Sequence, residues 1–263
     1  MTTRNARAVR EQTFGDACVE HLFRPLSTRQ FLEKHWPNRP WLRYGPSRRL
    51  APILGLPALR DLSTMLKTRG TYLSAVSPKF RSDQIQERGI TVAAARRRFE
   101  SGWTLTIGGL HEVVPELDQF LRQLATVLGL PEGGEMGRHR IIAYASPLGE
   151  ALACHFDPTA NFVIQIRGQK RWRIAPNRSV ENPVDVYSTR VPSERFAKLA
   201  SYCDVKRLPN KIPSRARSVV LSPGSVMFLP RGYWHETEAL ADSLSIHLVM
   251  HQPHGPISGR KPF

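Results

Sequence analysis

The strongest signal for the fold lies in residues 155–176, which read HFDPTANFVIQIRGQKRWRIAP. This segment holds two short apolar runs, NFVIQIRG (161–168) and QKRWRIAP (169–176), that meet at Gly168. Short apolar runs bounded by glycine and proline are typical of β-strands. We therefore expect Gly168 to turn the chain and Lys170 to begin an antiparallel return strand beside the first.

The same character continues on both sides of this segment. Further apolar runs separated by Gly, Pro and Asn are IIAYASP (141–147), ALACHFD (151–157), SVMFLP (225–230) and SLSIHLVM (243–250). Residues 177–217 are polar and carry proline and arginine, which favours long surface connections. Residues 136–263 are therefore predicted to form a mainly β core, either a sandwich of two sheets or a barrel.

The chain before this core is predicted to be a helical and irregular region, residues 1–135, that packs on the barrel. Helical spacing occurs in residues 27–36, 56–68, 91–100 and 111–129. The last of these is the strongest, because its apolar side chains fall on one stripe and Gly129 follows as a stop. The stripe consists of Val113, Leu117, Phe120, Leu121, Leu124 and Leu128.

Composition excludes several classes of protein. The chain has 263 residues, of which 41% are hydrophobic and 23% charged, as in ordinary globular proteins. No apolar run approaches the roughly 18 residues of a membrane-spanning helix, and the first residues lack the apolar stretch of a signal peptide. Three widely spaced cysteines favour neither a disulfide framework nor a cysteine-rich zinc site. We therefore expect a soluble, cytoplasmic protein.

The charge is strongly basic, with 38 Lys and Arg residues against 22 Asp and Glu residues and a net charge of +16. The excess is concentrated in residues 1–100. Such a region can attract RNA, a ribonucleoprotein or an acidic peptide. The alternative is that arginine simply fills solvated positions, because no aromatic or glycine pattern of an RNA-recognition module accompanies the charge.

Three side chains have the spacing of a metal site. His155 and Asp157 are two residues apart, so on a strand they point to the same face. His235 follows 80 residues later, at the end of a strand that closes with Pro230. Two imidazoles and one carboxylate form the facial ligand set of non-haem Fe(II) oxygenases. Zinc could use the same ligands, and either histidine taken alone is more often a structural residue.

The surrounding sequence resembles a known family. Residues 155–176 are similar to the metal-binding segment of JmjC-type Fe(II)/2-oxoglutarate oxygenases, among them factor inhibiting HIF. Residues 221–248, LSPGSVMFLPRGYWHETEALADSLSIHL, resemble the second metal-binding block of the bacterial ribosomal-protein hydroxylases, with Ser225 where an Asp is common. Residues 26–42 resemble the opening of that bacterial group.

The resemblance implies a double-stranded β-helix, the jelly-roll or cupin fold, in which His155, Asp157 and His235 bind Fe(II). It also implies that 2-oxoglutarate chelates the iron and that its distal carboxylate pairs with a cation at the position of Lys170. A buried cation needs such a partner. Further candidate contacts to the cosubstrate are Asn161, Ser245, His247 and Tyr144. Leu152 and Val249 stand where factor inhibiting HIF has a Thr and an Asn, and Cys154 is predicted to be structural.

The function that the family implies is hydroxylation with O₂ and 2-oxoglutarate, which releases succinate and CO₂. The leading substrate is a protein or peptide side chain, with a ribosomal protein as one option, and demethylation is the variant of this reaction. Alternatives are a modified tRNA base, which the charge of +16 would suit, a small molecule, or a non-catalytic cupin-like binding module. The oligomeric state does not follow from the sequence.

Overall fold

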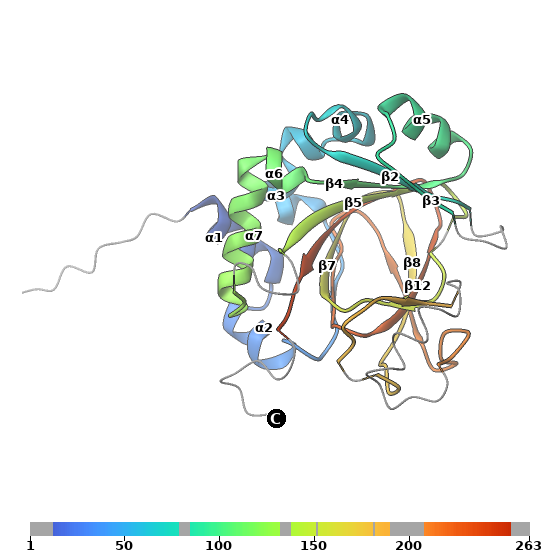
Figure 1. The fold of residues 1–263 in the computed structure, drawn as a ribbon. Helices are drawn as coiled ribbons and strands as arrows, with labels where there is room; N and C mark the ends of the chain where they lie inside the picture. Colours follow the sequence, from blue (N-terminus) through green and yellow to red (C-terminus); the bar gives the residue numbers. More distant parts are fainter. Residues whose placement is uncertain are drawn as a thin grey trace, which may run out of the picture.

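The computed structural model describes residues 13–78, 85–131, 138–150, 152–180, 182–189 and 208–253. These residues form two antiparallel β-sheets and a layer of helices (Figure 1). The mainly β fold class with a helical layer is therefore confirmed. Within the described ranges, no helix is both long and apolar enough to cross a membrane.

The two sheets differ in size, and each is ordered by its hydrogen-bonded neighbours. The larger sheet has the order β1 (Trp41–Arg43), β11 (Val226–Leu229), β7 (Ala160–Arg167), β13 (Ser243–Met250), β5 (Arg140–Ser146), β4 (Thr104–Gly108), β2 (Tyr72–Val76) and β3 (Gln86–Arg88). The smaller sheet has the order β10 (Arg217–Leu221), β8 (Lys170–Ala175), β12 (Trp234–Ala239), β6 (His155–Phe156) and β9 (Tyr187–Ser188).

The turn at Gly168 corrects the predicted pairing. Strands β7 and β8 lie in different sheets: β7 pairs with β11 and β13, and β8 pairs with β10 and β12. Gly168 has φ +64°, and a Cβ there would lie 1.9 Å from the carbonyl oxygen of Asp242. The glycine thus forms a tight corner between the two sheets, so the return strand does not lie beside the first.

Other strands also differ from the prediction. The run 151–157 contributes only the two residues of β6, and β10 and β12 were not predicted. His235 lies at the start of β12, not at the end of the strand that closes before Pro230. Strand β9 falls within the predicted connection 177–217, of which residues 181 and 190–207 lie outside the described ranges.

The amino-terminal region contributes more than helices. The helices are α1 (Phe14–Phe23), α2 (Thr28–Lys34), α3 (Ala51–Leu54), α4 (Leu62–Lys67), α5 (Val92–Glu100), α6 (Leu110–Val113) and α7 (Pro115–Val127), with short 3-10 turns at Ser47–Leu50 and Pro57–Leu59. Strands β1 to β4 also come from this region and join the larger sheet. The domain boundary between residues 135 and 136 stays a prediction.

The four predicted helical segments all contain helix, and local chemistry sets their ends. Ser27 and Gln30 form a capping box at the start of α2, where each side chain accepts a hydrogen bond from the other residue's backbone N–H. The stretch 111–129 is divided into α6 and α7, because Pro115 opens a new helix at a position where its missing N–H is not needed.

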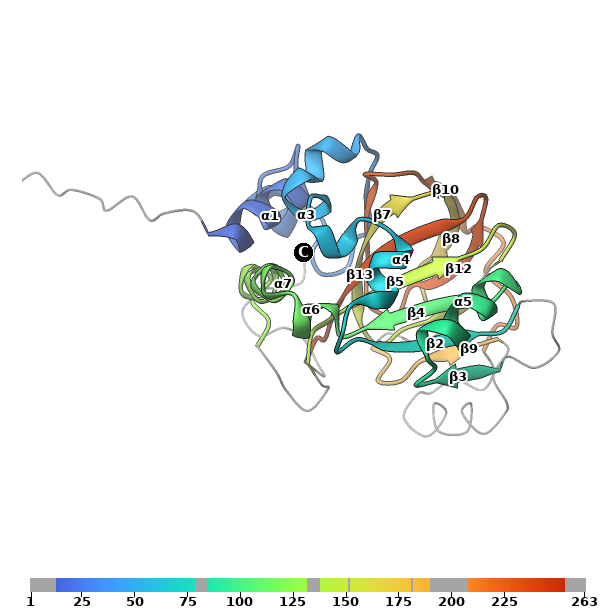
Figure 2. The same cartoon turned by 90° about the horizontal axis from the view of Figure 1, so that it is seen from above.

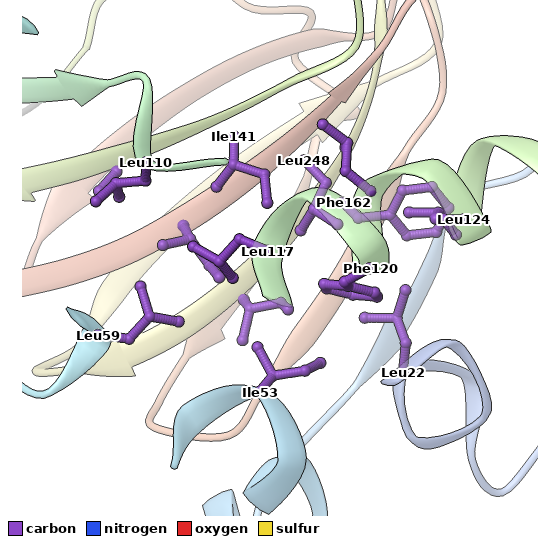
Figure 3. Close-up of a cluster of buried hydrophobic side chains, with 14 of the residues drawn as sticks. Leu22, Ile53, Leu59, Leu110, Leu117, Phe120, Leu124, Ile141, Phe162 and Leu248 are labelled. Atoms are coloured by element: carbon purple, nitrogen blue, oxygen red, sulfur yellow. The ribbon is translucent and has the colours of Figure 1, made fainter. Parts of the chain in front are cut away.

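The helices cover the outer face of the larger sheet (Figures 1 and 2). Alternate strand residues such as Ile141, Phe162 and Leu248 pack there against Leu117 and Phe120 of α7, as Figure 3 shows. This is the largest apolar cluster of the described residues. The inner faces of the two sheets carry a smaller apolar cluster, which includes Val163, Trp172 and Met227, beside the polar side chains described below.

Candidate active site

Two strands of the smaller sheet bring the three predicted metal ligands together. His155 of β6 is paired directly with His235 of β12, and their ring centroids are 4.0 Å apart. Asp157 follows β6, and its Oδ2 atom lies 3.6 Å from Nε2 of His235. One ligand atom from each residue lies within 4.8 Å of the others. These atoms can therefore coordinate a single ion.

Backbone carbonyls orient both imidazoles. Nδ1 of His155 is 2.7 Å from the carbonyl oxygen of Ala153, and Nδ1 of His235 is 2.9 Å from that of Tyr233. A proton on each Nδ1 leaves Nε2 as a free lone pair, the form in which histidine binds a metal. Burial, and then the neighbouring His155, lower the pKa of His235 to about 4. This ring is therefore neutral at ordinary pH.

Asp157 is held through both its backbone and its side chain. The backbone N–H of Gly232 donates to the carbonyl of Asp157 at 3.0 Å, which ties the β11–β12 turn to this residue. The side-chain Nδ2 of Asn161 donates to Oδ2 of Asp157 at 3.3 Å. Asn161 thus lies beside the metal ligands, and its direct contact is with a ligand.

Lys170 lies deep between the sheets. Its side chain is only 1% exposed, and its ammonium donates to Oγ of Ser146 at 2.8 Å. Burial lowers the pKa of Lys170 to about 8. Among the described residues it forms no ion pair, although a buried charge is normally paired. The site therefore contains an uncompensated cation that an anion could neutralise.

The rival cations of this region point elsewhere. Arg171 and Arg173 lie on the outer face of β8, where they pair with Glu238 and Glu236 at 2.6 Å. Arg167 donates to the backbone carbonyl of Arg60. The inward orientation of Lys170, which the alternation along β8 predicts, is confirmed.

Strands β5 and β13 of the larger sheet contribute polar side chains to the inner face. The rings of Tyr144 and His247 are 4.4 Å apart, and Nε2 of His247 is 3.3 Å from Oγ of Ser245. Burial is the main cause that lowers the pKa of His247 well below its ordinary value and raises that of Tyr144 to about 12. Both side chains are therefore neutral hydrogen-bonding groups on the inner face.

Some contributors to the site were missed by the sequence analysis. Ser146 contacts Lys170, and Thr104 donates to Ser146 at 3.2 Å. Thr237 is buried on β12, and its Oγ1 accepts a hydrogen bond from the backbone N–H of Leu152. The alternation His235, Thr237 could have predicted Thr237, whereas Ser146 depends on pairing between distant strands.

Ser225 and Cys154 contribute to the packing and turns of the fold and not to the candidate site. Ser225 is buried at the β10–β11 turn, where its hydroxyl accepts a hydrogen bond from the backbone N–H of Ser222 at 3.1 Å. Cys154 packs outside the smaller sheet with Phe156 and Trp234, and burial raises the pKa of its thiol to about 12. The prediction that Cys154 is structural agrees with this packing.

The fold and the site together define a class. Two antiparallel sheets that enclose two imidazoles, a carboxylate and a buried lysine have the architecture of the cupin-type 2-oxoglutarate-dependent dioxygenases. Residues 135–255 match the family model of the JmjC domain. The match confirms, for these residues, the JmjC resemblance that the sequence predicted.

Comparisons with known proteins agree with this assignment. The chain is 28% identical over 241 residues to the Bacillus subtilis (strain 168) protein YxbC, covering 90% of this chain and 72% of that protein. It is 27% identical over 206 residues to human ribosomal oxygenase 1, covering 74% of this chain and 28% of that protein.

A solved structure shows the same fold. This structure is of YcfD, a ribosomal oxygenase from Escherichia coli, in complex with cobalt and 2-oxoglutarate. It aligns with a TM-score of 0.57 and 18% identity over 88% of this chain and 53% of that chain. The chain thus spans about half of the bacterial enzyme and about a quarter of the human one.

Proposed function

We propose that the protein is an Fe(II)- and 2-oxoglutarate-dependent oxygenase that hydroxylates a side chain of a protein or peptide. The observation that carries this proposal is the combination of a His–Asp–His ligand set with a buried lysine that forms no ion pair with any described residue. A metal site alone would suit many functions. The unpaired ammonium adds a place for the second carboxylate of a keto diacid.

The residues fit both groups. His155, Asp157 and His235 would hold the ion through two Nε2 atoms and a carboxylate oxygen, which leaves about three positions of an octahedral ion for other ligands. Lys170 would pair with the distal carboxylate of 2-oxoglutarate, and Ser146 would keep the ammonium in place. The lysine lies on the same inner face as Trp172, whose ring is stacked 5.7 Å from that of His235.

The bound iron and cosubstrate would supply oxidative decarboxylation of the keto acid, with release of succinate and CO₂, and oxidation of a substrate C–H bond. The protein's part is placement. The neutral imidazole of His235 offers a lone pair without first losing a proton. Tyr144, Ser245 and His247 line the inner face beside the cosubstrate, where they can donate hydrogen bonds to it and limit the entry of water.

For the substrate, we propose a ribosomal protein. The support is sequence similarity to human ribosomal oxygenase 1 and the fold shared with the bacterial ribosomal oxygenase. Such a target would place the enzyme in the cytoplasm.

The first prediction tests the metal site. In the Asp157→Ala variant, we expect succinate formation from 2-oxoglutarate with added Fe(II) to fall by at least about 100-fold, because the ion loses a charged ligand. Asp118→Ala is the matched control, since this carboxylate lies on the surface of α7, where it pairs with Arg122. Equal turnover in Asp157→Ala and the wild type would contradict the proposed function.

A second candidate is hydroxylation of a tRNA base by the same chemistry. The observation that favours it is the net charge of +16. Binding of tRNA should then weaken steeply as salt is raised, because bound phosphates release counterions. Mass spectrometry of tRNA and of ribosomal proteins after incubation with enzyme, looking for a gain of one oxygen atom, separates the two substrates.

A further inference from the structure

Arg140 lies on the inner face of the larger sheet, level with the metal ligands. Asn161 of β7 is paired with Val249 of β13, and Val249 is paired with Arg140 of β5. Directly paired residues project to the same face of a sheet. Asn161 faces inward, because its side chain donates a hydrogen bond to Asp157. The side chain of Arg140 therefore leaves its strand on the inner face as well. Two strand spacings separate Arg140 from Asn161, roughly 10 Å.

The position of Arg140 along the barrel separates it from the cosubstrate. Strand β5 begins at Arg140 and ends at Ser146, which accepts the hydrogen bond from Lys170. Six residues of strand span roughly 20 Å. Tyr144 lies between these ends and is influenced by the charges of both Asp157 and Arg140. Arg140 is therefore at the opposite end of the barrel from the lysine that would hold 2-oxoglutarate.

The charge of Arg140 is free to act on a ligand. Its side chain is exposed, and within the described part of the chain it forms no ion pair. Among the described residues, the carboxylate of Glu112 lies 3.9 Å from Nε2 of His111, and burial, aided by the charge of this carboxylate, raises the pKa of Tyr72. An exposed arginine on the inner face that forms no ion pair with a described carboxylate is suited to an anionic group of a substrate.

An aromatic side chain, Tyr72, lies on the same inner face as Arg140. Tyr72 of β2 is paired with Gly108 of β4, and Gly108 is paired with Ile142 of β5, so Tyr72 shares the inner face with Arg140. The ring of Tyr72 is half exposed and lies over Gly108, where a Cβ would be 2.0 Å from the ring. The glycine thus leaves room for the half-exposed aromatic ring on the inner face at this end of the sheet.

We propose that Arg140 determines substrate specificity by binding a carboxylate of the substrate, an Asp or Glu side chain, while Tyr72 supports the peptide beside it. This inference rests on the proposed function, since it assumes a peptide that enters at the metal end of the barrel. An extended chain advances about 3.3 Å per residue. The acidic residue should therefore lie about three positions from the oxidised residue.

The test uses a degenerate peptide library incubated with the full chain, Fe(II), 2-oxoglutarate and air. Mass spectrometry identifies the peptides that gain one oxygen atom. We expect peptides hydroxylated by the wild type to be enriched in Asp or Glu about three positions from the modified residue. The Arg140→Glu variant should reverse this preference toward Lys and Arg, whereas succinate formation without peptide stays within about twofold of the wild type.

Arg97→Glu is the control with the same change of charge, because Arg97 is exposed on α5, which covers the outer face of the sheet. It should leave the sequence preference unchanged. If peptides are hydroxylated with the same preference by the wild type and by Arg140→Glu, the inference about Arg140 is overturned and the proposed function stands. If the wild type hydroxylates no peptide, the proposed function fails, and this inference fails with it.

Discussion

Lys170 is a charged side chain in a place that ordinarily excludes charge. It is 1% exposed, its ammonium contacts only the hydroxyl of Ser146 among the described residues, and burial lowers its pKa to about 8 from 10.5. Because the charged form is disfavoured in the folded state, Lys170 destabilises the protein when no ligand is bound. A carboxylate ligand, as in the proposed function, would neutralise this charge, so the proposed function and the stability of the unliganded protein are opposed at this residue.

The second prediction follows from that opposition. Without metal or cosubstrate, the free energy of unfolding of Lys170→Met at pH 7 should exceed that of the wild type by up to about 3 kcal/mol. This is the free-energy equivalent of the lowered pKa of Lys170. The KM of this variant for 2-oxoglutarate should rise at least about tenfold. Urea unfolding and succinate assays measure the two effects. Lys170→Arg, which keeps the charge, should retain part of the affinity for 2-oxoglutarate.

The pH dependence of stability tests independently whether the charge of Lys170 lowers the free energy of unfolding. Between pH 8 and 10.5 the unfolded state keeps the proton on Lys170 and the folded state releases it, so the wild type gains stability as pH rises through this window. Other groups also titrate there, so the quantity to measure is the difference between wild type and Lys170→Met. This difference should shrink from pH 8 to pH 10. A constant difference would show that the charge of Lys170 is not its cause.

Most of the site could be predicted at the level of single residues. Alternation along a strand is enough to place Lys170 inward and Arg171 outward, and a spacing of two residues brings His155 and Asp157 to one face. Ser146 could not be predicted, because its contact with Lys170 depends on how β5 and β8 face each other across the barrel. Distances between strands that are far apart in sequence are set by topology, which local patterns do not contain.

At the level of elements, the apolar pattern predicted strands better than it predicted their partners. The runs 161–168 and 169–176 are both strands, yet they belong to different sheets. An antiparallel pair and a corner between two sheets both require a tight glycine turn, so Gly168 alone does not distinguish them. Strand β12, with its alternation of His235, Thr237 and glutamates, was missed because it lacks a continuous apolar run.

The third prediction concerns α2 and the sheet beneath it. Phe31 is fully buried, stacks on Phe23 with centroids 4.2 Å apart, and meets Phe228 at 5.3 Å and Phe162 at 5.7 Å. Phe31→Ala should lower the free energy of unfolding by about 3–5 kcal/mol, because it leaves a cavity between helix and sheet. Denaturant titration measures this change.

A surface substitution provides the comparison for Phe31. Leu148 is 67% exposed, so Leu148→Ala should change the free energy of unfolding by less than about 0.5 kcal/mol. Since Phe31 packs on the outer face of the larger sheet, turnover per folded molecule should persist in Phe31→Ala below its unfolding temperature. Loss of turnover without loss of stability would mean that α2 shapes the site directly.

For the whole molecule, the helical layer and the barrel have separate tasks. The helices bury the outer face of the larger sheet, and the inner faces of both sheets hold the polar groups of the site. A ligand that binds between the sheets contacts both of them at once. Binding of the metal and the cosubstrate should therefore stabilise the fold as a unit.

The fourth prediction measures this coupling. With Co(II) and 2-oxoglutarate, each at about 100 times its dissociation constant, the free energy of unfolding should rise by about 2.7 kcal/mol per independent site. For a chain of this size, each kcal/mol raises Tm by about 2–4 °C, so the cosubstrate's share alone is roughly 5–10 °C. Asp157→Ala should lose the response to both ligands, whereas Lys170→Met should keep the response to Co(II) and lose that to 2-oxoglutarate. A wild-type Tm that stays unchanged with both ligands would mean that the barrel binds neither, and an equal response of Lys170→Met to 2-oxoglutarate would remove the lysine from the binding site.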